Sequence, residues 1–142
     1  MKWILATLTL FVTPYASAFC FNEAGEKFDV NPRLLAAICY TESSFRVDAV
    51  NANNSDGTVD NGLCQINSWW YPKLEKFGIS VSDLKTDACL NTHVSAWIMA
   101  QNFETHGENW QSVGAYNAGF KESRQGARDK YIALVKTNLE RM

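Results

Sequence analysis

The sequence predicts a single, mainly α-helical domain with a small irregular or hairpin excursion around residues 51–66. Apolar residues recur at helical spacing in several segments, for example at Leu34 and Ile38. Between these segments, Asn51 to Gly62 reads NANNSDGTVDNG, a polar stretch that is typical of a loop or hairpin. The length of 142 residues and the hydrophobic share of 46% suit one packed domain and exclude a disordered chain.

The N-terminal segment has the pattern of a secretory signal peptide. Lys2 supplies a positive start, residues 3–12 are apolar, and residues 16–18 (ASA) form a small-x-small cleavage site. We therefore expect residues 1–18 to be a signal peptide and residues 19–142 to be the exported domain. The apolar run is too short to span a bilayer, so we expect no stable membrane anchor. The alternative is that this segment is a buried N-terminal helix.

Two helices are expected before the polar stretch. The first is short, at about residues 21–28. The second begins at Asn31-Pro32, a cap followed by a first-turn proline, and continues through Ile38 to Glu42. Glu42 falls on the apolar stripe of this helix, where burial would raise the pKa of its carboxyl and make it a possible general acid. The alternative is a helix-end glutamate that reaches solvent.

Further helices are expected after the polar stretch, and each has a cap or a terminating glycine. Ser68 is expected to cap the first of them, and Leu90, Val94 and Ile98 have helical spacing in the longest. The expected spans are Ser68 to about Gly78, about Asp87 to about Gly107, Trp110 to about Gly119, and Ser123 to about Leu139.

The charge and the histidines exclude several classes of partner. Thirteen Lys and Arg against 15 Asp and Glu give a net charge of −2, so no basic field is available for a nucleic acid. His93 and His106 are solitary, and the calcium-loop pattern fails because Ala52 and Leu63 occupy its first and last ligand positions. We expect no nucleic acid partner, no metal and no cofactor.

The four cysteines are expected to form two disulfides, because an exported chain meets an oxidising environment. None of their spacings resembles a C-x-x-C zinc or redox site, and three pairings remain open at this point. The residues are Cys20, Cys39, Cys64 and Cys89.

Three short motifs resemble those of the soluble lytic transglycosylase family. They are Glu42-Ser43, then GLCQI at residues 62–66, then AYNAG at residues 115–119. In this order they resemble the family's E-S, G-L-M-Q-I and A-Y-N-A-G motifs, and the resemblance runs from about Cys20 to Phe120. The small members associated with secretion systems and pili are the most similar. The resemblance implies a lysozyme-like α+β fold and cleavage of peptidoglycan glycan strands in the periplasm.

The resemblance also implies a role for each matched position. Glu42 would protonate the glycosidic oxygen between N-acetylmuramic acid and N-acetylglucosamine, and would then remove the 6-hydroxyl proton to give a 1,6-anhydro product. The expected substrate-binding positions are Ser43, Gln65, Asn67, Tyr116 and Asn117. Asn67 and Asn117 have an alternative role in tying down a loop, and Ser43 has one as an ordinary helix-end serine.

Two positions depart from the family pattern. Asp60 lies in the polar stretch, and our hypothesis is that it faces Glu42 and stabilises positive charge on the sugar; the alternative is a solvated turn aspartate. Cys64 stands where the family motif has Met. Because the resemblance brings both motifs to one cleft, it implies a Cys39–Cys64 disulfide, which leaves Cys20 to pair with Cys89.

The sequence therefore predicts a monomeric periplasmic lytic transglycosylase that acts on peptidoglycan strands and opens the wall for a secretion or pilus apparatus. One of that apparatus's components is an expected partner. The alternatives are a hydrolytic muramidase that uses Glu42 with Asp60, and a non-catalytic glycan-binding assembly module.

Overall fold

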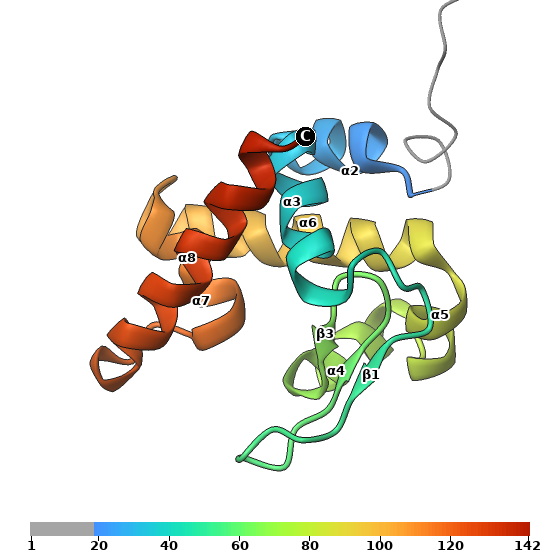
Figure 1. Ribbon diagram of the computed structural model, residues 1–142. Coiled ribbons are helices and arrows are strands. Elements are labelled where there is room, and N and C mark those ends of the chain that lie inside the picture. The colour runs from blue at the N-terminus through green and yellow to red at the C-terminus, as the bar shows by residue number, and fades with distance from the viewer. Residues whose placement is uncertain (1–18) are drawn as a thin grey trace, which may run out of the picture.

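A computed structural model describes residues 19–142 and has a mainly helical architecture with one small sheet (Figure 1). The expected signal peptide, residues 1–18, lies outside the described residues. Within the described range, no helix is both long enough and apolar enough to cross a membrane. The α-helices are α2 (Phe21–Phe28), α3 (Pro32–Ser43), α4 (Tyr71–Leu74), α5 (Val81–Thr86), α6 (Ala88–His106), α7 (Trp110–Ala118) and α8 (Gln125–Glu140).

Local sequence signals account for the start and end of α3, the helix that carries Glu42. The Asn31 side chain caps it by accepting hydrogen bonds from the backbone N–H groups of Arg33 and Leu34, at 2.9 and 3.3 Å. The helix ends at Ser44, whose φ of 54° is left-handed and turns the chain away. Glu42 thereby lies in the last turn, next to the hairpin that follows.

The polar stretch folds into a three-stranded antiparallel sheet of very short strands. The strands are β1 (Val50–Asn51), β2 (Asp60–Asn61) and β3 (Ile66–Asn67), paired in the order β1-β2-β3. Asp60 lies opposite Asn51 on one side and opposite Asn67 on the other. The register therefore surrounds the Asp60 carboxylate with amide side chains.

The segment after β3 corrects the helix expected to begin at Ser68. It is broken into a 3-10 turn η1 (Ser68–Trp70), the one-turn helix α4 and a second 3-10 turn η2 (Glu75–Phe77). Asn67 provides the cap by accepting from the Trp69 N–H at 2.9 Å. The Ser68 hydroxyl instead accepts from the Val59 N–H at 3.0 Å, which ties this segment to the hairpin.

Helix α5 has no counterpart among the predicted elements. Its six residues are too few to show a clear apolar period. The sequence signal for its start is a capping box, in which Ser80 and Asp83 each accept a hydrogen bond from the other's backbone N–H.

The long helix α6 crosses the molecule behind the hairpin and packs against α2, α5 and α7 (Figure 1). Helix α8 packs against both α3 and α7, after a short 3-10 turn η3 (Glu122–Arg124). The close approach of α7 and α8 needs Gly114, where a Cβ atom would lie 3.0 Å from Arg128 and Ile132 side-chain atoms. Helix α8 thus packs against α3 and α7, which come from different parts of the chain.

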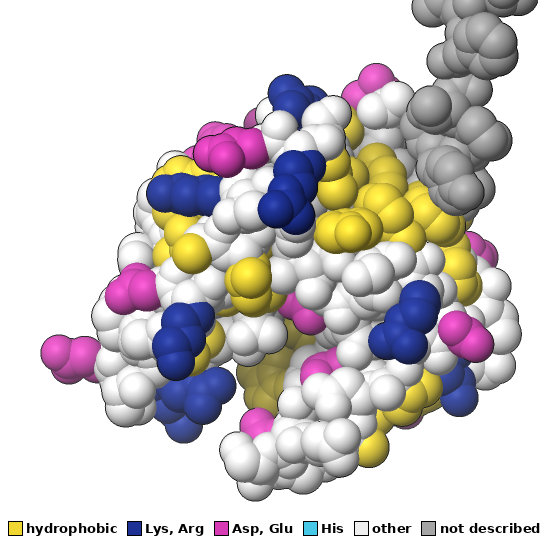
Figure 2. Space-filling model, viewed as in Figure 1, with side chains coloured by type: hydrophobic (Ala, Val, Ile, Leu, Met, Phe, Trp, Pro, Cys, Tyr) yellow, Lys and Arg dark blue, Asp and Glu magenta, His cyan; other side chains and the backbone are white. Residues whose placement is uncertain are grey.

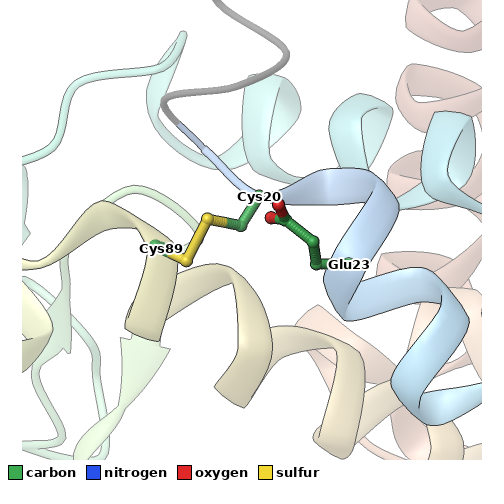
Figure 3. Close-up of side chains that lie close together, drawn as sticks. All are labelled: Cys20, Glu23 and Cys89. Carbon is green, nitrogen blue, oxygen red and sulfur yellow. A yellow bond between two sulfur atoms is a disulfide. The ribbon is translucent and has the colours of Figure 1, made fainter.

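Two disulfides join these elements in the pairing that the resemblance implies. Cys39 bonds to Cys64, which links α3 to the segment before β3, and Cys20 bonds to Cys89, which links α2 to the start of α6. Figure 3 shows the Glu23 carboxylate close to the second bond. Because both sulfurs there are in the disulfide, this cluster offers no thiolate to a metal ion.

Candidate active site

A cleft of about 760 Å³ lies between the hairpin and the α7–α8 side of the molecule. Figure 2 shows it as a hollow in which acidic side chains are visible. Glu42, Gln65, Ile98 and Tyr116 are among its lining residues, and Asp60 lines it from the hairpin. The cleft therefore brings together the three motifs identified in the sequence. It also contains Asp60, which departs from the family pattern.

Glu42 is held as a largely desolvated carboxyl at the end of α3. Desolvation raises the pKa of Glu42 from 4.5 to about 8, against the opposing effect of a hydrogen bond from Tyr131 and with a further increase from the Asp60 charge. The Tyr131 hydroxyl donates to Glu42 Oε1 at 2.6 Å. At neutral pH the Glu42 carboxyl therefore carries a proton that it can give to a bound substrate.

Tyr131 is a site residue that was not predicted from the sequence. It lies in α8, beyond the end of the resemblance, and its ring is buried in the core. Burial and the neighbouring Glu42 carboxylate raise the pKa of the Tyr131 phenol well above 10, so the phenol remains a donor. One sequence signal was available, since Tyr131 lies on the apolar stripe of a helix. A tyrosine hydroxyl that is buried in this way needs a hydrogen-bond partner.

Asp60 is held in place by three amide side chains. Its Oδ2 accepts from the Nδ2 atoms of Asn51 at 3.0 Å and Asn54 at 2.8 Å, and its Oδ1 accepts from Asn67 Nδ2 at 2.7 Å. This residue is in strand β2 and lines the cleft with Glu42, and its role toward the sugar stays a hypothesis.

The segment that carries Gln65 is shaped by an unusual backbone. Gly62 has a φ of +83°, and a Cβ there would lie 2.0 Å from the Leu84 carbonyl oxygen and 2.1 Å from Asn91 Nδ2. Gln65 itself has a φ of 52°, and its Nε2 donates to the carbonyl oxygens of Ala49 and Gly62, both at 3.0 Å. Gln65 therefore lines the cleft from a segment whose shape requires glycine at position 62.

Asn91 supports this segment from behind, and its role too was not predicted from the sequence. Its side chain is fully buried in α6, where Oδ1 accepts from the Cys64 N–H at 2.9 Å. Its Nδ2 donates to the carbonyl oxygens of Asn61 and Leu84, at 3.0 and 2.8 Å. A single amide thereby satisfies three buried backbone groups around the bend at Gly62.

Tyr116 connects α7 to the same segment. Its hydroxyl donates to the Cys64 carbonyl oxygen at 2.7 Å, and its ring lines the cleft. Burial, together with the charges of Glu42 and Asp60, raises the pKa of the Tyr116 phenol, which keeps it protonated. Tyr116 is thus a neutral group with its hydroxyl directed at the backbone beside Gln65.

The remaining expected binding residues differ in their exposure to the cleft. Asn117 is exposed on its wall, while Asn67 lines it and uses its amide on Asp60 and on Thr58 Oγ1, at 2.7 and 2.8 Å. Ser43 is only 4% exposed, and its hydroxyl donates to the Leu63 carbonyl oxygen at 2.6 Å. The Ser43 hydroxyl therefore ties α3 to the Gln65 segment, and a substrate contact at Ser43 stays a prediction.

This geometry suits the cleavage of an acetal bond between sugars. A protonated carboxyl is available to a leaving oxygen, and a hydrogen-bonded carboxylate lines the same cleft. Trp69 is 63% exposed and lines the cleft beside Trp70, which offers a flat aromatic surface to a sugar ring.

Comparisons with known proteins agree with this geometry. The sequence profile described as "Transglycosylase SLT domain" matches residues 19–137. The chain is 40% identical over 129 residues to "X polypeptide" of Escherichia coli, covering 89% of this chain and 76% of that protein. It is 35% identical over 140 residues to "Invasion protein IagB" of Salmonella typhimurium (strain SL1344), covering 99% and 83%. It is 36% identical over 131 residues to "Protein IpgF" of Shigella flexneri, covering 92% and 86%.

A solved structure shares the fold. The structure of an inactive mutant of lytic transglycosylase Slt from Pseudomonas aeruginosa aligns with a TM-score of 0.59 at 20% identity. The alignment covers 92% of this chain but only 25% of that one. The likeness therefore concerns the fold of one part of a much longer chain.

Proposed function

Because the chain belongs to the transglycosylase SLT domain family and has its lysozyme-like fold, we propose that it cleaves peptidoglycan between N-acetylmuramic acid and N-acetylglucosamine with formation of a 1,6-anhydro product. As a member of this family the chain is a lytic transglycosylase. We propose which bond it cuts, which product it releases and in which setting it acts.

The observation that carries the proposal is the protonated state of Glu42 inside the cleft. With a pKa of about 8, Glu42 is an acid at neutral pH and can protonate the glycosidic oxygen as the bond to the anomeric carbon breaks. Asp60 would stabilise the positive charge that develops at the anomeric carbon. The amides of Asn51, Asn54 and Asn67 support this role because they hold the Asp60 carboxylate in place.

The second half of the reaction returns the proton to Glu42. The substrate's acetamido group stabilises the anomeric centre, and Glu42, now a carboxylate, accepts the proton of the sugar's 6-hydroxyl. That oxygen forms the new bond to the anomeric carbon and closes the 1,6-anhydro ring. Tyr131 would stabilise the intermediate carboxylate because it donates to Glu42 Oε1. Gln65, Tyr116 and Asn117 would orient the sugars along the cleft.

A hydrolytic muramidase is the second candidate, and the position of Asp60 favours it. Hydrolysis of this kind uses an acid and a second carboxyl group in one cleft, and Glu42 and Asp60 form such a pair. The two reactions differ in the acceptor, which is the sugar's own 6-hydroxyl in one and water in the other.

The test is the mass of the muropeptides released from purified peptidoglycan. The proposed reaction gives products that are lighter by one water than those of hydrolysis. Wild-type protein should clear a peptidoglycan zymogram, and Glu42→Gln should abolish clearing because the proton donor is lost. Hydrated products alone would favour the muramidase, and no release from wild type would leave a non-catalytic glycan-binding module.

We extend the proposal to the setting in which the enzyme acts. Two disulfides and a wall-cleaving family support export to the periplasm, where residues 1–18 would be removed as a signal peptide. The relative named an invasion protein supports local opening of the wall for a secretion or pilus apparatus. Cell fractionation, with mass spectrometry of proteins cross-linked to the enzyme, tests both points. A cytoplasmic location or the recovery of no apparatus component would contradict them.

A further inference from the structure

We propose that residues 119–124 form a cationic platform that binds the carboxylates of peptidoglycan stem peptides, so that the enzyme prefers peptide-bearing strands to bare glycan. The inference rests on the proposed function, because it assigns a substrate class to the same cleft. Lys121 and Arg124 are the residues that would bind the peptide.

The two walls of the cleft carry opposite charges. Asp56 and Asp60 line the hairpin wall, while Lys121 and Arg124 line the facing wall between α7 and α8. In Figure 2, basic side chains are gathered on the α7–α8 side of the hollow and an acidic one lies toward the end of the hairpin. Within the described part of the chain, Glu122 lies outside the cleft lining and does not neutralise this wall from inside.

The charges interact across the cleft without forming a closed ion pair. The Thr58 hydroxyl and backbone N–H lower the pKa of the Asp56 carboxyl most, and the Arg124 charge lowers it further. Between residues 19 and 142, no hydrogen bond or ion pair engages the side chain of Lys121 or Arg124, and both residues are exposed. Their charges are therefore available to a ligand in the cleft.

A buried arginine fixes the platform in place. Arg128, in the first turns of α8, is 5% exposed, and its Nη1 donates to the carbonyl oxygens of Gly119 and Lys121, both at 2.8 Å. Its Nε and Nη2 donate to the Oε1 atoms of Gln111 and Gln125, at 3.1 and 2.6 Å. The Arg128 side-chain nitrogens all donate hydrogen bonds within the protein, so Arg128 holds residues 119–124 in place. Lys121 and Arg124 are left to face the cleft.

The chemistry of the strand matches this asymmetry. N-acetylglucosamine is neutral, whereas N-acetylmuramic acid carries a lactyl group extended by a peptide that ends in carboxylates. An acidic wall repels these carboxylates and a basic wall attracts them. A peptide-bearing strand is thereby oriented with its peptides toward Lys121 and Arg124 and its sugar faces toward the aromatic surface of Trp69.

The test compares two substrates and two charge-matched variants. The substrates are soluble peptidoglycan strands with their stem peptides and the same strands after an amidase has removed the peptides. The variants are Lys121→Gln/Arg124→Gln and, as a control, Lys130→Gln/Arg141→Gln, which removes the same charge from exposed positions of α8 and its C-terminus outside the cleft. We expect the first variant to raise KM for peptide-bearing strands about three- to tenfold, with a smaller effect on kcat.

For bare strands, the first variant should keep the wild-type KM, and the control should match wild type on both substrates. Equal KM changes on both substrates, or none on peptide-bearing strands, would overturn the inference while the proposed function stands. If wild type cleaves neither substrate, the proposed function fails, and binding alone tests the inference. For that purpose, each kind of strand is titrated into Glu42→Gln protein, with and without Lys121→Gln/Arg124→Gln. The change in tryptophan fluorescence gives the affinity. Equal affinity for peptide-bearing and bare strands would overturn the inference there.

Discussion

At the scale of single residues, the protonation of Glu42 is set by groups that act in opposite directions. Burial and the Asp60 charge raise the pKa of its carboxyl, whereas the hydrogen bond from Tyr131 lowers it. Because Asp60 and Tyr131 come from different elements, each effect can be removed separately. The pH dependence of kcat/KM reports the pKa of the free enzyme's essential acid.

We expect Asp60→Asn to lower the pKa of Glu42 from its value of about 8, because a neighbouring negative charge is removed. The alkaline limb of kcat/KM should move to lower pH, and NMR titration of the Glu42 carboxyl should show the same shift. Asp56→Asn is the matched control, since it removes the same charge from the hairpin wall at a position that does not set the Glu42 pKa. An unchanged or higher pKa in Asp60→Asn would contradict the structure.

Tyr131→Phe should have the opposite effect. The substitution removes the hydrogen bond that favours the charged carboxylate, so the pKa of Glu42 should rise above about 8 and the alkaline limb should move to higher pH. Activity at neutral pH should also fall, roughly ten- to a hundredfold, because the carboxylate formed after proton transfer loses its donor. Tyr40→Phe, in the same helix as Glu42 but exposed, is the control. A shift to lower pH would contradict this account.

At the scale of elements, the helices were predictable where a local signal marks their ends. Asn31-Pro32 and Gly119 are such signals, and the helices that they bound begin or end as expected. The broken segment from Ser68 to Phe77 was not predictable, because the hairpin takes the Ser68 hydroxyl and leaves capping to Asn67. Short 3-10 turns also show too few residues for a periodic pattern.

The site was predictable in part for a related reason. Glu42, Gln65 and Tyr116 lie in contiguous motifs, so the resemblance found them. Tyr131 and Asn91 act through contacts with distant segments, at separations of 89 residues for Tyr131 to Glu42 and 27 for Asn91 to Cys64. Only the folded structure brings such partners together.

The bend at Gly62 gives a prediction at this scale. Gly62 and Gly57 both have positive φ, so alanine at either position strains the backbone by about 1 kcal/mol. Only at Gly62 would the new Cβ also meet the Leu84 carbonyl and Asn91, whereas nothing lies within 4 Å at Gly57. We expect Gly62→Ala to lower the free energy of unfolding by about 3 kcal/mol or more and to reduce kcat/KM. Gly57→Ala should cost only about 1 kcal/mol in urea unfolding, and equal losses would contradict the argument.

At the scale of the whole molecule, two disulfides join segments that are distant in the sequence. In the chain-entropy model, the Cys20–Cys89 bond, with a separation of 69 residues, stabilises by about 4 kcal/mol. The Cys39–Cys64 bond, with a separation of 25 residues, stabilises by about 3.5 kcal/mol. The two bonds thus have similar effects on stability, but only the Cys39–Cys64 bond directly adjoins a residue that lines the cleft, since Cys64 precedes Gln65.

Replacing each cysteine pair by serine should therefore have similar effects on stability but different effects on activity. Cys20→Ser/Cys89→Ser should lower the free energy of unfolding by about 4 kcal/mol and, well below its melting temperature, keep its turnover. Cys39→Ser/Cys64→Ser should lose a similar amount of stability and also turnover, because Tyr116 donates to the Cys64 carbonyl oxygen. Thermal unfolding and muropeptide release measure the two quantities. Equal turnover losses in both variants would argue against a special role for the Cys39–Cys64 bond.

The Cys39–Cys64 bond also has a consequence for the maturation of the enzyme. Cys39 lies three residues before Glu42 and Cys64 directly before Gln65, so one covalent bond joins the two halves of the reactive centre. A newly made chain in a reducing cytosol lacks this bond and the stability that it adds. If the chain is exported as we propose, we expect it to be inactive and readily degraded before export, and to gain activity only once this bond has formed. Under the proposed export, the formation of this one disulfide bond would separate the synthesis of the chain from the onset of its activity.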